Sequence, residues 1–280
     1  MLRRRLITGP ILILVLVGLG WLDGMVAAAS GRAGVVLAIL AIGVLIPVSA
    51  WEAATMVRAA GHRISVPVAV VSAELLCLCL LVAPRIGESA DAAGIVALGV
   101  FLVAIAAFVV VLRGGRIEGG FGSIAATILV AIWTGLFIGF WVLTAEGGGA
   151  AFAAGLILIV KAGDIGAYTV GMLVGRRKLI PWLSPGKTIE GAGGAVAGSM
   201  LAGVVLAGLV GAIPWWAGLL LGGVLGVIGA LGDLFESLLK REAGWKDSGR
   251  TLPGMGGLLD VLDSLLLAGP VVWMFMWMID

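Results

Sequence analysis

The sequence predicts an all-α fold, that of a polytopic integral membrane protein with about nine transmembrane helices and a cytoplasmic N-terminus. The chain of 280 residues is 61% hydrophobic and only 12% charged, whereas soluble chains carry about 25% charged residues. Its mean hydropathy is +1.19. Long apolar runs recur along the whole length, which is typical of helical membrane proteins. A soluble globular domain is therefore excluded.

The apolar runs define the helices in order. Each except the last reaches the ~17–25 residues that a bilayer requires. The first run follows M-L-R-R-R and resembles a signal peptide with a cleavage point near Ala27, but its length favours an uncleaved first span. The expected helices are residues 7–29, 34–54, 64–83, 92–112, 122–144, 151–174, 191–213, 215–239 and 264–278.

The positions of the basic residues support this topology. Lys161 falls within a span, and of the other Lys and Arg residues only Arg32 and Arg85 fall on one side. All the rest fall on the opposite side, which the positive-inside rule identifies as the cytoplasm. Loops 175–190 and 240–263 therefore lie on the same side, where they can meet.

The segment 232–263 concentrates charge in an otherwise apolar chain. Charges beside a bilayer are costly and are usually retained for a function. Asp233 and Glu236 are spaced i, i+3 at the end of one span, and Asp260 and Asp263 repeat this spacing at the start of the next. Such pairs lie on one helical face. Because carboxylate oxygens are the ligands that Mg²⁺ prefers, the segment predicts a magnesium site.

The same segment carries groups that suit phosphate. Lys240, Arg241 and Lys246 lie between the two carboxylate pairs and supply positive charge for a polyphosphate. Gly256 and Gly257 would let the backbone approach a ligand closely. The alternative interpretation is a solvated amphipathic loop, which the dense mixture of acids, bases and glycines disfavours.

A second candidate lies in the loop at residues 176–191. Its basic triplet alone would indicate an anchor for anionic lipid. The loop lacks the first glycine of GxxxxGK, so it is not a Walker A motif. Lys187 can nevertheless contact phosphate, Ser184 and Thr188 can donate hydrogen bonds to it, and Glu190 starts the next helix.

Three polar residues lie inside the expected helix 151–174. Lys161, Asp164 and Tyr168 are spaced i, i+3, i+7 and share one helical face. Ionisable groups within a span face a polar interior rather than lipid. Two interpretations remain open, a structural ion pair that orients helices and the polar wall of a substrate cavity.

Two other patterns have structural interpretations. The glycine-rich run 191–198 lacks a true GxGxxG, and its Gly194 and Gly198 form a GxxxG pair that favours helix packing. Cys77 and Cys79 are two residues apart on a helix and point to different faces, so they are expected to be packing residues rather than a disulfide or metal site.

The charged segment closely resembles the signature of phosphatidate cytidylyltransferases, also called CDP-diacylglycerol synthases. Three upstream motifs, around Asp164, Lys187 and Asp233, are similar to family motifs in the same order. The resemblance extends from Asp164 to Asp263, whereas the N-terminal half matches only as generic membrane helices. The matching positions of the main signature are Ser237, Lys240, Arg241, Lys246, Asp247, Gly249, Leu252, Pro253, Gly256, Gly257, Leu258, Asp260, Leu262 and Asp263.

Two positions depart from the family pattern. Met255 stands where the family usually has His, and Val261 stands where it usually has Arg. If the family's His or Arg contacts a substrate phosphate, this chain makes that contact differently.

The resemblance implies transfer of the cytidylyl group of CTP to phosphatidic acid, which gives CDP-diacylglycerol and pyrophosphate in phospholipid biosynthesis. It implies Mg²⁺, with a second cation left open, and a multi-pass location in the inner (cytoplasmic) membrane. The expected partners are CTP, phosphatidic acid, the lipid bilayer and a second copy in a homodimer, with no nucleic acid. Residues 1–150 would form a membrane scaffold with a role in dimerisation, and residues 151–280 the catalytic region with its site on the cytoplasmic side.

The resemblance also implies roles for individual residues. By analogy with two-metal displacement, Asp233 and Asp260 are expected to be metal ligands, with Asp263 and Glu236 as auxiliary ligands. The phosphate nucleophile is already ionised, so no general base is needed and His62 has no expected catalytic role. The expected catalytic residues are Asp233, Asp260, Lys240 and Lys246. The expected substrate-binding residues are Ser184, Lys187, Thr188, Glu190, Arg241, Ser237, Asp164, Tyr168, Gly256 and Gly257.

Three alternatives to this function remain open. The first is an enzyme that uses CTP on another lipid phosphate or on an isoprenoid. The second is a secondary transporter in which Lys161, Asp164 and Glu74 form a relay across the membrane. The third is a catalytically silent relative, motivated by Met255 and Val261.

Overall fold

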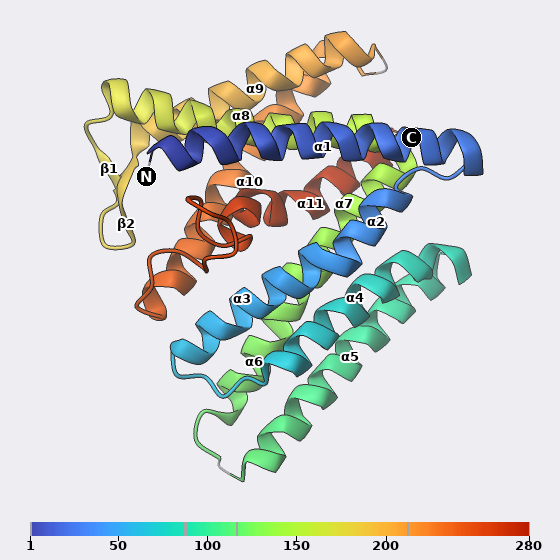
Figure 1. The fold of residues 1–280 in the computed structure, drawn as a ribbon, viewed down its shortest axis with the longest axis vertical. Coiled ribbons are helices and arrows are strands. Elements are labelled where there is room, and N and C mark those ends of the chain that lie inside the picture. The colour runs from blue at the N-terminus through green and yellow to red at the C-terminus, as the bar shows by residue number, and fades with distance from the viewer. Residues whose placement is uncertain (1, 87–88, 116, 212, 280) are drawn as a thin grey trace.

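The computed structural model describes residues 2–86, 89–115, 117–211 and 213–279. Within these ranges the chain is almost entirely helical, which confirms the predicted fold class (Figure 1). The helical elements are α1 (Leu2–Ser30), α2 (Val35–Leu40), a π-helical stretch (Ala41–Leu45), α3 (Ile46–Ala59), α4 (Val66–Ile86), α5 (Ser89–Gly114), α6 (Gly120–Val130), a second π-helical stretch (Ala131–Leu136), α7 (Phe137–Gly148), α8 (Ala150–Val174), α9 (Ile189–Val210), α10 (Trp215–Glu242) and α11 (Leu259–Ile279).

Eight helical segments of the described chain are long and apolar enough to cross a membrane. They correspond in order to the second to ninth predicted spans, with ends that differ by a few residues. The first predicted span lies within α1, which is 29 residues long. The protein is therefore a multi-pass membrane protein.

The last helix starts earlier than its predicted bounds. It begins at Leu259 rather than at residue 264, so Asp260 and Asp263 lie in its first turns. The backbone N–H groups of Leu258 and Leu259 donate to the carboxylate of Glu52 in α3. A side chain from another helix therefore satisfies donors that a helix start leaves unpaired, and no local sequence pattern signals this cap.

The loop at residues 175–190 contains a β-hairpin that the sequence did not predict. β1 (Lys178–Ile180) pairs antiparallel with β2 (Ser184–Thr188), with an irregularity in the register. The turn is closed by the N–H of Leu183, which donates to the carbonyl of Ile180. The strands are short and carry no apolar alternation, so the usual sequence signal of a hairpin is missing.

The hydrophobic core joins the two regions into which the sequence was divided. One cluster combines Ala53 and Met56 of α3 and Trp133 between α6 and α7 with Leu259 and Leu266 of α11. A second cluster lies among α7, α8, α10 and α11. The N-terminal helices therefore pack directly against the helices that carry the charged segment.

Close glycine contacts bring α8, α9 and α10 together. A Cβ added at Gly194 would lie 2.6 Å from the Cβ of Val170, and one added at Gly198 would lie 2.7 Å from the carbonyl oxygen of Ala162. The backbones of α8 and α9 thus touch, which is the role of small residues between helices in lipid. The glycine-rich run is a helix-packing motif, as predicted. Cys77 is buried and Cys79 is partly buried, and both are free thiols.

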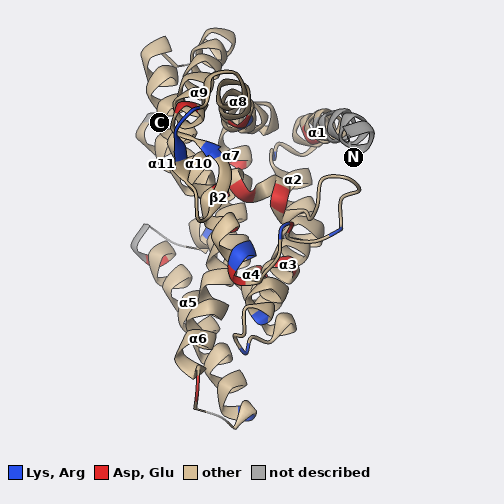
Figure 2. Ribbon diagram, turned by 90° about the vertical axis from the view of Figure 1, so that its left-hand side faces the viewer, with Lys and Arg blue, Asp and Glu red and all other residues tan. Residues whose placement is uncertain are grey.

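The polar connections gather at one end of the helices. In Figure 1 the N-terminus, the hairpin and the connection between α10 and α11 all lie toward the left, whereas the turn between α1 and α2 and the C-terminus lie toward the right. Figure 2 shows that the helices are mostly uncharged and that blue and red segments come together around α10. This arrangement allows the two charged loops to meet, as the topology requires.

The contact of Gly198 with α8 gives a direct test of this packing. We expect Gly198→Ala to lower the free energy of unfolding in detergent by about 1–3 kcal/mol, because the new methyl group must displace backbone atoms. Gly193→Ala on the same helix is the matched control, since a Cβ there meets nothing within 4 Å. In thermal unfolding, equal effects of the two variants would contradict the packing role.

Candidate active site

A cavity of about 480 Å³ lies between the C-terminal half of α8, the hairpin, the start of α9 and the C-terminal half of α10. Glycine and alanine form much of its wall, so the small residues that let the helices approach also leave this space. Six of the predicted site residues line the cavity, namely Asp164, Tyr168, Ser184, Lys187, Thr188 and Asp233. The structure therefore brings together residues from three separate sequence motifs.

The start of α9 fixes the hairpin beside this cavity. Thr188 caps the helix, since its Oγ1 accepts a hydrogen bond of 3.0 Å from the N–H of Gly191. The carboxylate of Glu190 accepts from the N–H groups of Arg176 and Arg177 at 3.1 and 3.2 Å. Glu190 thus holds the base of the hairpin and is not among the cavity-lining residues. Its substrate-binding role stays a prediction.

An ion pair crosses the cavity. The Nζ of Lys187 in β2 lies 2.9 Å from Oδ2 of Asp233 in α10, and both side chains are partly exposed. The hydroxyl of Ser237, one turn further along α10, donates to Oδ1 of Asp233 at 3.3 Å. Lys187 is thus placed to contact a phosphate in the cavity, and a phosphate would compete with Asp233 for it.

Lys161 joins α8 to α11. Its Nζ contacts Oδ2 of Asp164 at 3.0 Å, and the carbonyl oxygen of Val261 and Oγ of Ser264, both at 2.9 Å. The hydroxyl of Ser264 also donates to Asp164. Both interpretations of this polar face hold in part: Lys161 makes a structural link, whereas Asp164 and Tyr168 line the cavity.

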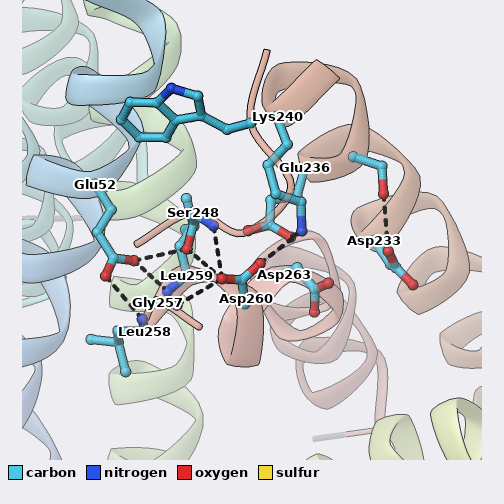
Figure 3. Close-up of polar contacts among 12 residues, drawn as sticks. Glu52, Asp233, Glu236, Lys240, Ser248, Gly257, Leu258, Leu259, Asp260 and Asp263 are labelled. Carbon is cyan, nitrogen blue, oxygen red and sulfur yellow. Dashed lines mark hydrogen bonds and ion pairs between the residues drawn. The ribbon is translucent and has the colours of Figure 1, made fainter. Parts of the chain in front are cut away.

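A second polar centre lies where α10 meets α11. Lys240 forms ion pairs with Glu236 and, at 2.8 Å, with Oδ1 of Asp260. The side chain of Glu236 is completely buried and that of Lys240 is 12% exposed. Oδ2 of Asp260 accepts from the N–H and the hydroxyl of Ser248 and from the N–H of Gly257, at 2.7–2.9 Å (Figure 3). Lys240 thus places one positive charge between two acidic side chains in this structure.

The four predicted metal ligands do not surround one point. No three His, Cys, Asp or Glu side chains in the described part of the chain lie close enough to hold a metal ion by themselves. Asp263 nevertheless lies beside Asp233, because α10 touches α11 at Gly232, where a Cβ would lie 3.2 Å from the Cα of Ser264.

The donor set at this junction fits Mg²⁺. Asp233 and Asp263 bring two carboxylates to the junction of α10 and α11. Mg²⁺ typically uses one or two carboxylates together with substrate phosphates and waters. The metal assignment therefore stays a prediction, with the substrate as a required source of ligands.

The remaining predicted residues lie on the connection between the two helices. Arg241 donates to the carbonyl oxygens of Leu183 and Trp245, both at 3.3 Å, and so links the hairpin turn to the end of α10. Lys246 is exposed. Gly256 has a φ of +99°, a left-handed conformation that favours glycine. These positions are compatible with substrate contacts, but they do not line the cavity.

Glu52 is a site residue that sequence reasoning missed. It belongs to α3, is 1% exposed and accepts four hydrogen bonds from the connection between α10 and α11. The sequence does carry one sign of its importance, the charge of Glu52 within the predicted span 34–54. An ionisable residue inside a membrane helix is by default a candidate for function. Its partners are about 200 positions away in sequence, so the contact itself could not be foreseen.

The fold and the site define a class of protein, a membrane enzyme whose polar cavity at the helix ends suits phosphate-bearing substrates. The chain matches the cytidylyltransferase family over residues 3–279 and belongs to that family.

Individual relatives agree with this assignment. A phosphatidate cytidylyltransferase of Mycobacterium leprae is 42% identical over 166 residues, which cover 58% of this chain and 52% of that protein. One from Synechocystis is 42% identical over 132 residues, or 44% of each chain. The uncharacterized protein YnbB of Escherichia coli is 34% identical over 183 residues, 62% of this chain and 61% of that protein. The chain thus spans about half the length of the phosphatidate cytidylyltransferases that it matches.

The buried ion pairs of Lys240 predict a large effect on stability. We expect Lys240→Met to lower the free energy of unfolding by about 3–5 kcal/mol, because it leaves the buried carboxylate of Glu236 without its cation. Lys246→Met, at an exposed position nearby, is the control and should change it by less than about 0.5 kcal/mol. Denaturation in detergent measures both. Adding Glu236→Gln to Lys240→Met should recover part of the loss, and no recovery would contradict this explanation.

Proposed function

We propose that this protein transfers the cytidylyl group of CTP to phosphatidic acid and releases pyrophosphate and CDP-diacylglycerol. One observation carries the proposal: motifs that match the cytidylyltransferase family converge on a cavity containing Lys187 and Asp233, beside the Lys240–Asp260 pair. The relatives named phosphatidate cytidylyltransferase support the choice of both substrates.

The cavity offers suitable groups for both substrates. Lys187 supplies positive charge, and the hydroxyl of Ser184 can donate a hydrogen bond to phosphate oxygens. Tyr168 and Met172 also line the cavity and are 69% and 66% exposed, so their side of it presents a largely apolar surface. We infer that the acyl chains of the lipid lie along this surface while the nucleotide enters from water.

The reaction requires positioning and charge neutralisation more than covalent chemistry. A phosphate oxygen of the lipid attacks the α-phosphorus of CTP, and the bond to the bridging oxygen of pyrophosphate breaks in line with it. The nucleophile is already ionised, so no general base is needed. His62 pairs with Glu242 at 3.6 Å and does not line the cavity, which agrees with its lack of a catalytic role.

A magnesium ion would neutralise charge on the phosphates of CTP during this step. Asp233 and Asp263 lie on the two helices that meet at Gly232 and would hold it, with Asp260 one turn before Asp263 on α11. With the carboxylate of Asp233 engaged in this way, Lys187 would be free to bind phosphate. The second cation and the homodimer remain expectations from the family resemblance.

The transporter alternative has no structural support. It needs Glu74 to share a polar path with Lys161 and Asp164, but Glu74 does not line the cavity. Both of its carboxylate oxygens are buried, and neither has a hydrogen-bond partner among the described residues. The cavity itself lies toward the helix ends that carry the charged loops.

Activity with labelled CTP tests the proposal. With Mg²⁺ and phosphatidate in mixed micelles, we expect label to enter a lipid product, and Asp233→Asn and Asp260→Asn each to lower the rate at least ~100-fold, as for loss of a transition-state charge contact. Asp91→Asn at the start of α5 should leave the rate unchanged. Chelation of divalent cations should abolish activity, and added Mg²⁺ should restore it.

Parallel assays separate the lipid alternatives, one with an isoprenoid phosphate and CTP labelled at the α-phosphate, the other with an isoprenoid alcohol and CTP labelled at the γ-phosphate. Labelling of those acceptors, but not of phosphatidate, would overturn the choice of substrate. No labelling by folded protein with any acceptor would favour a catalytically silent relative.

Location in the inner membrane with the site on the cytoplasmic side makes a separate prediction. In a protein with both native cysteines replaced, we expect cysteine in place of the exposed Trp182 at the hairpin turn to react with a membrane-impermeant maleimide from the cytoplasmic face. Cysteine in place of Arg32 should react only from the opposite face. The reverse pattern would contradict the proposed orientation.

A further inference from the structure

The carboxylate of Glu52 is the centre of a set of hydrogen bonds between the two halves of the chain. Its Oε1 accepts from Oγ1 of Thr251 at 2.6 Å and from the N–H of Leu258 at 3.1 Å. Its Oε2 accepts from the N–H of Leu259 at 2.8 Å and from Oγ of Ser248 at 3.1 Å. Both oxygens of a fully buried acid are thus satisfied, and every donor comes from residues 248–259.

Two glycines of the connection leave room for this carboxylate because they have no side chain. A Cβ added at Gly249 would lie 2.7 Å from Oε1 of Glu52, and one added at Gly257 would lie 2.5 Å from its Oε2. Any larger residue at either position would displace the acid. The glycines of the charged segment therefore make room for Glu52, in addition to any role near a ligand.

The hydrogen bonds continue from Glu52 to the catalytic candidates. The N–H of Ser248 donates to Oδ2 of Asp260 at 2.8 Å. Its hydroxyl lies 3.1 Å from Oε2 of Glu52 and 2.9 Å from Oδ2 of Asp260, so its single proton is shared between the two carboxylates. Oδ1 of Asp260 in turn accepts from Lys240 at 2.8 Å. Figure 3 shows this continuous path, with Glu52 at one end and Glu236 beside Lys240 at the other.

We propose that Glu52 is a positioning residue for cytidylyl transfer: it fixes residues 246–258 so that Asp260 and Lys240 keep their places beside the cavity. Its kinetic consequence rests on the function proposed above, whereas its effect on the connection does not. The N-terminal helices then form part of the catalytic apparatus and do more than provide a scaffold.

Glu52→Gln tests this role with almost no change in size. The amide nitrogen cannot accept a hydrogen bond, so two of the four donors lose Glu52 as an acceptor whichever way the amide is oriented. One of the two keeps a second acceptor, Thr251 for Leu258 or Asp260 for Ser248. We expect kcat to fall at least ~10-fold, since a misplacement of about 1 Å by a mutation far from the chemistry can cost about 100-fold. KM for CTP should change far less, because the hairpin and its Lys187 do not contact Glu52.

A second readout needs no substrate. Lys246 and Arg250 are exposed on the connection, and Arg113 is exposed at the end of α5. We expect trypsin to cleave Glu52→Gln after Lys246 or Arg250 several times faster than wild type, with cleavage after Arg113 as the internal reference. A purely global destabilisation would raise cleavage at all three sites together.

Asp23→Asn is the matched control. Asp23 is 2% exposed, lies in the N-terminal half and accepts from the N–H groups of Gly34 and Val36, both at 2.9 Å, so it too is a buried acid that binds backbone at a helix start. Neither of these two partners lies in the connection between α10 and α11. We expect Asp23→Asn to retain the kcat and the cleavage pattern of wild type among folded molecules.

The outcomes separate the two proposals. Wild-type kcat and cleavage in Glu52→Gln, or parallel losses in Glu52→Gln and Asp23→Asn, would overturn the positioning role. If Glu52→Gln does not fold, Thr251→Val tests the positioning role in its place, because it removes one donor to Glu52. We expect this variant to reduce kcat and to speed cleavage of the connection. Wild-type kcat and cleavage would overturn the role. If wild-type protein forms no CDP-diacylglycerol, the proposed function fails, while selective cleavage in Glu52→Gln would still establish the anchoring of the connection.

Discussion

The burial of charge where α3, α10 and α11 meet is the constraint on which the rest of the structure depends. A carboxylate removed from water is costly unless donors or cations surround it. Glu52 meets this need with four hydrogen bonds, and Asp260 meets it with Ser248, Gly257 and Lys240. Glu236 is paired with Lys240 through Oε2 alone, and its Oε1 has no hydrogen-bond partner among the described residues. Since the donors come from three segments of the chain, the helices and the connection can satisfy these groups only in one arrangement.

The close approach of small residues decides where the cavity lies. Gly194 and Gly198 let α9 touch α8, and Gly232 lets α10 touch α11. These contacts bring Asp164, Lys187 and Asp233 from three separate elements to one cavity. Packing of apolar helices and placement of polar groups are thus two results of the same contacts.

The ion pairs of the site hold its basic side chains in position for an anionic substrate. Lys187 is paired with Asp233 and Lys240 with Asp260 and Glu236, so the positive groups are neutralised by acids of the site. A triphosphate brings its own negative charge, and with a cation on the carboxylates it would replace the acids as the partner of Lys187.

The sequence by itself determined the membrane class, the order of the helices and the motifs of the site. Apolar runs of fixed length are sufficient for the first two, because a spanning helix must satisfy its own backbone in lipid. The charges near Asp233 and Asp260 indicated the site because they are costly beside a bilayer.

Only the tertiary structure decided which of these groups meet. The hairpin lacks a local signal, Glu190 binds its backbone, and Lys240 lies between two acids. Glu52 reaches its partners across about 200 positions of sequence. Sequence spacing places groups on one face of a helix, but contacts between helices depend on how their surfaces pack, and this information is distributed over the whole chain.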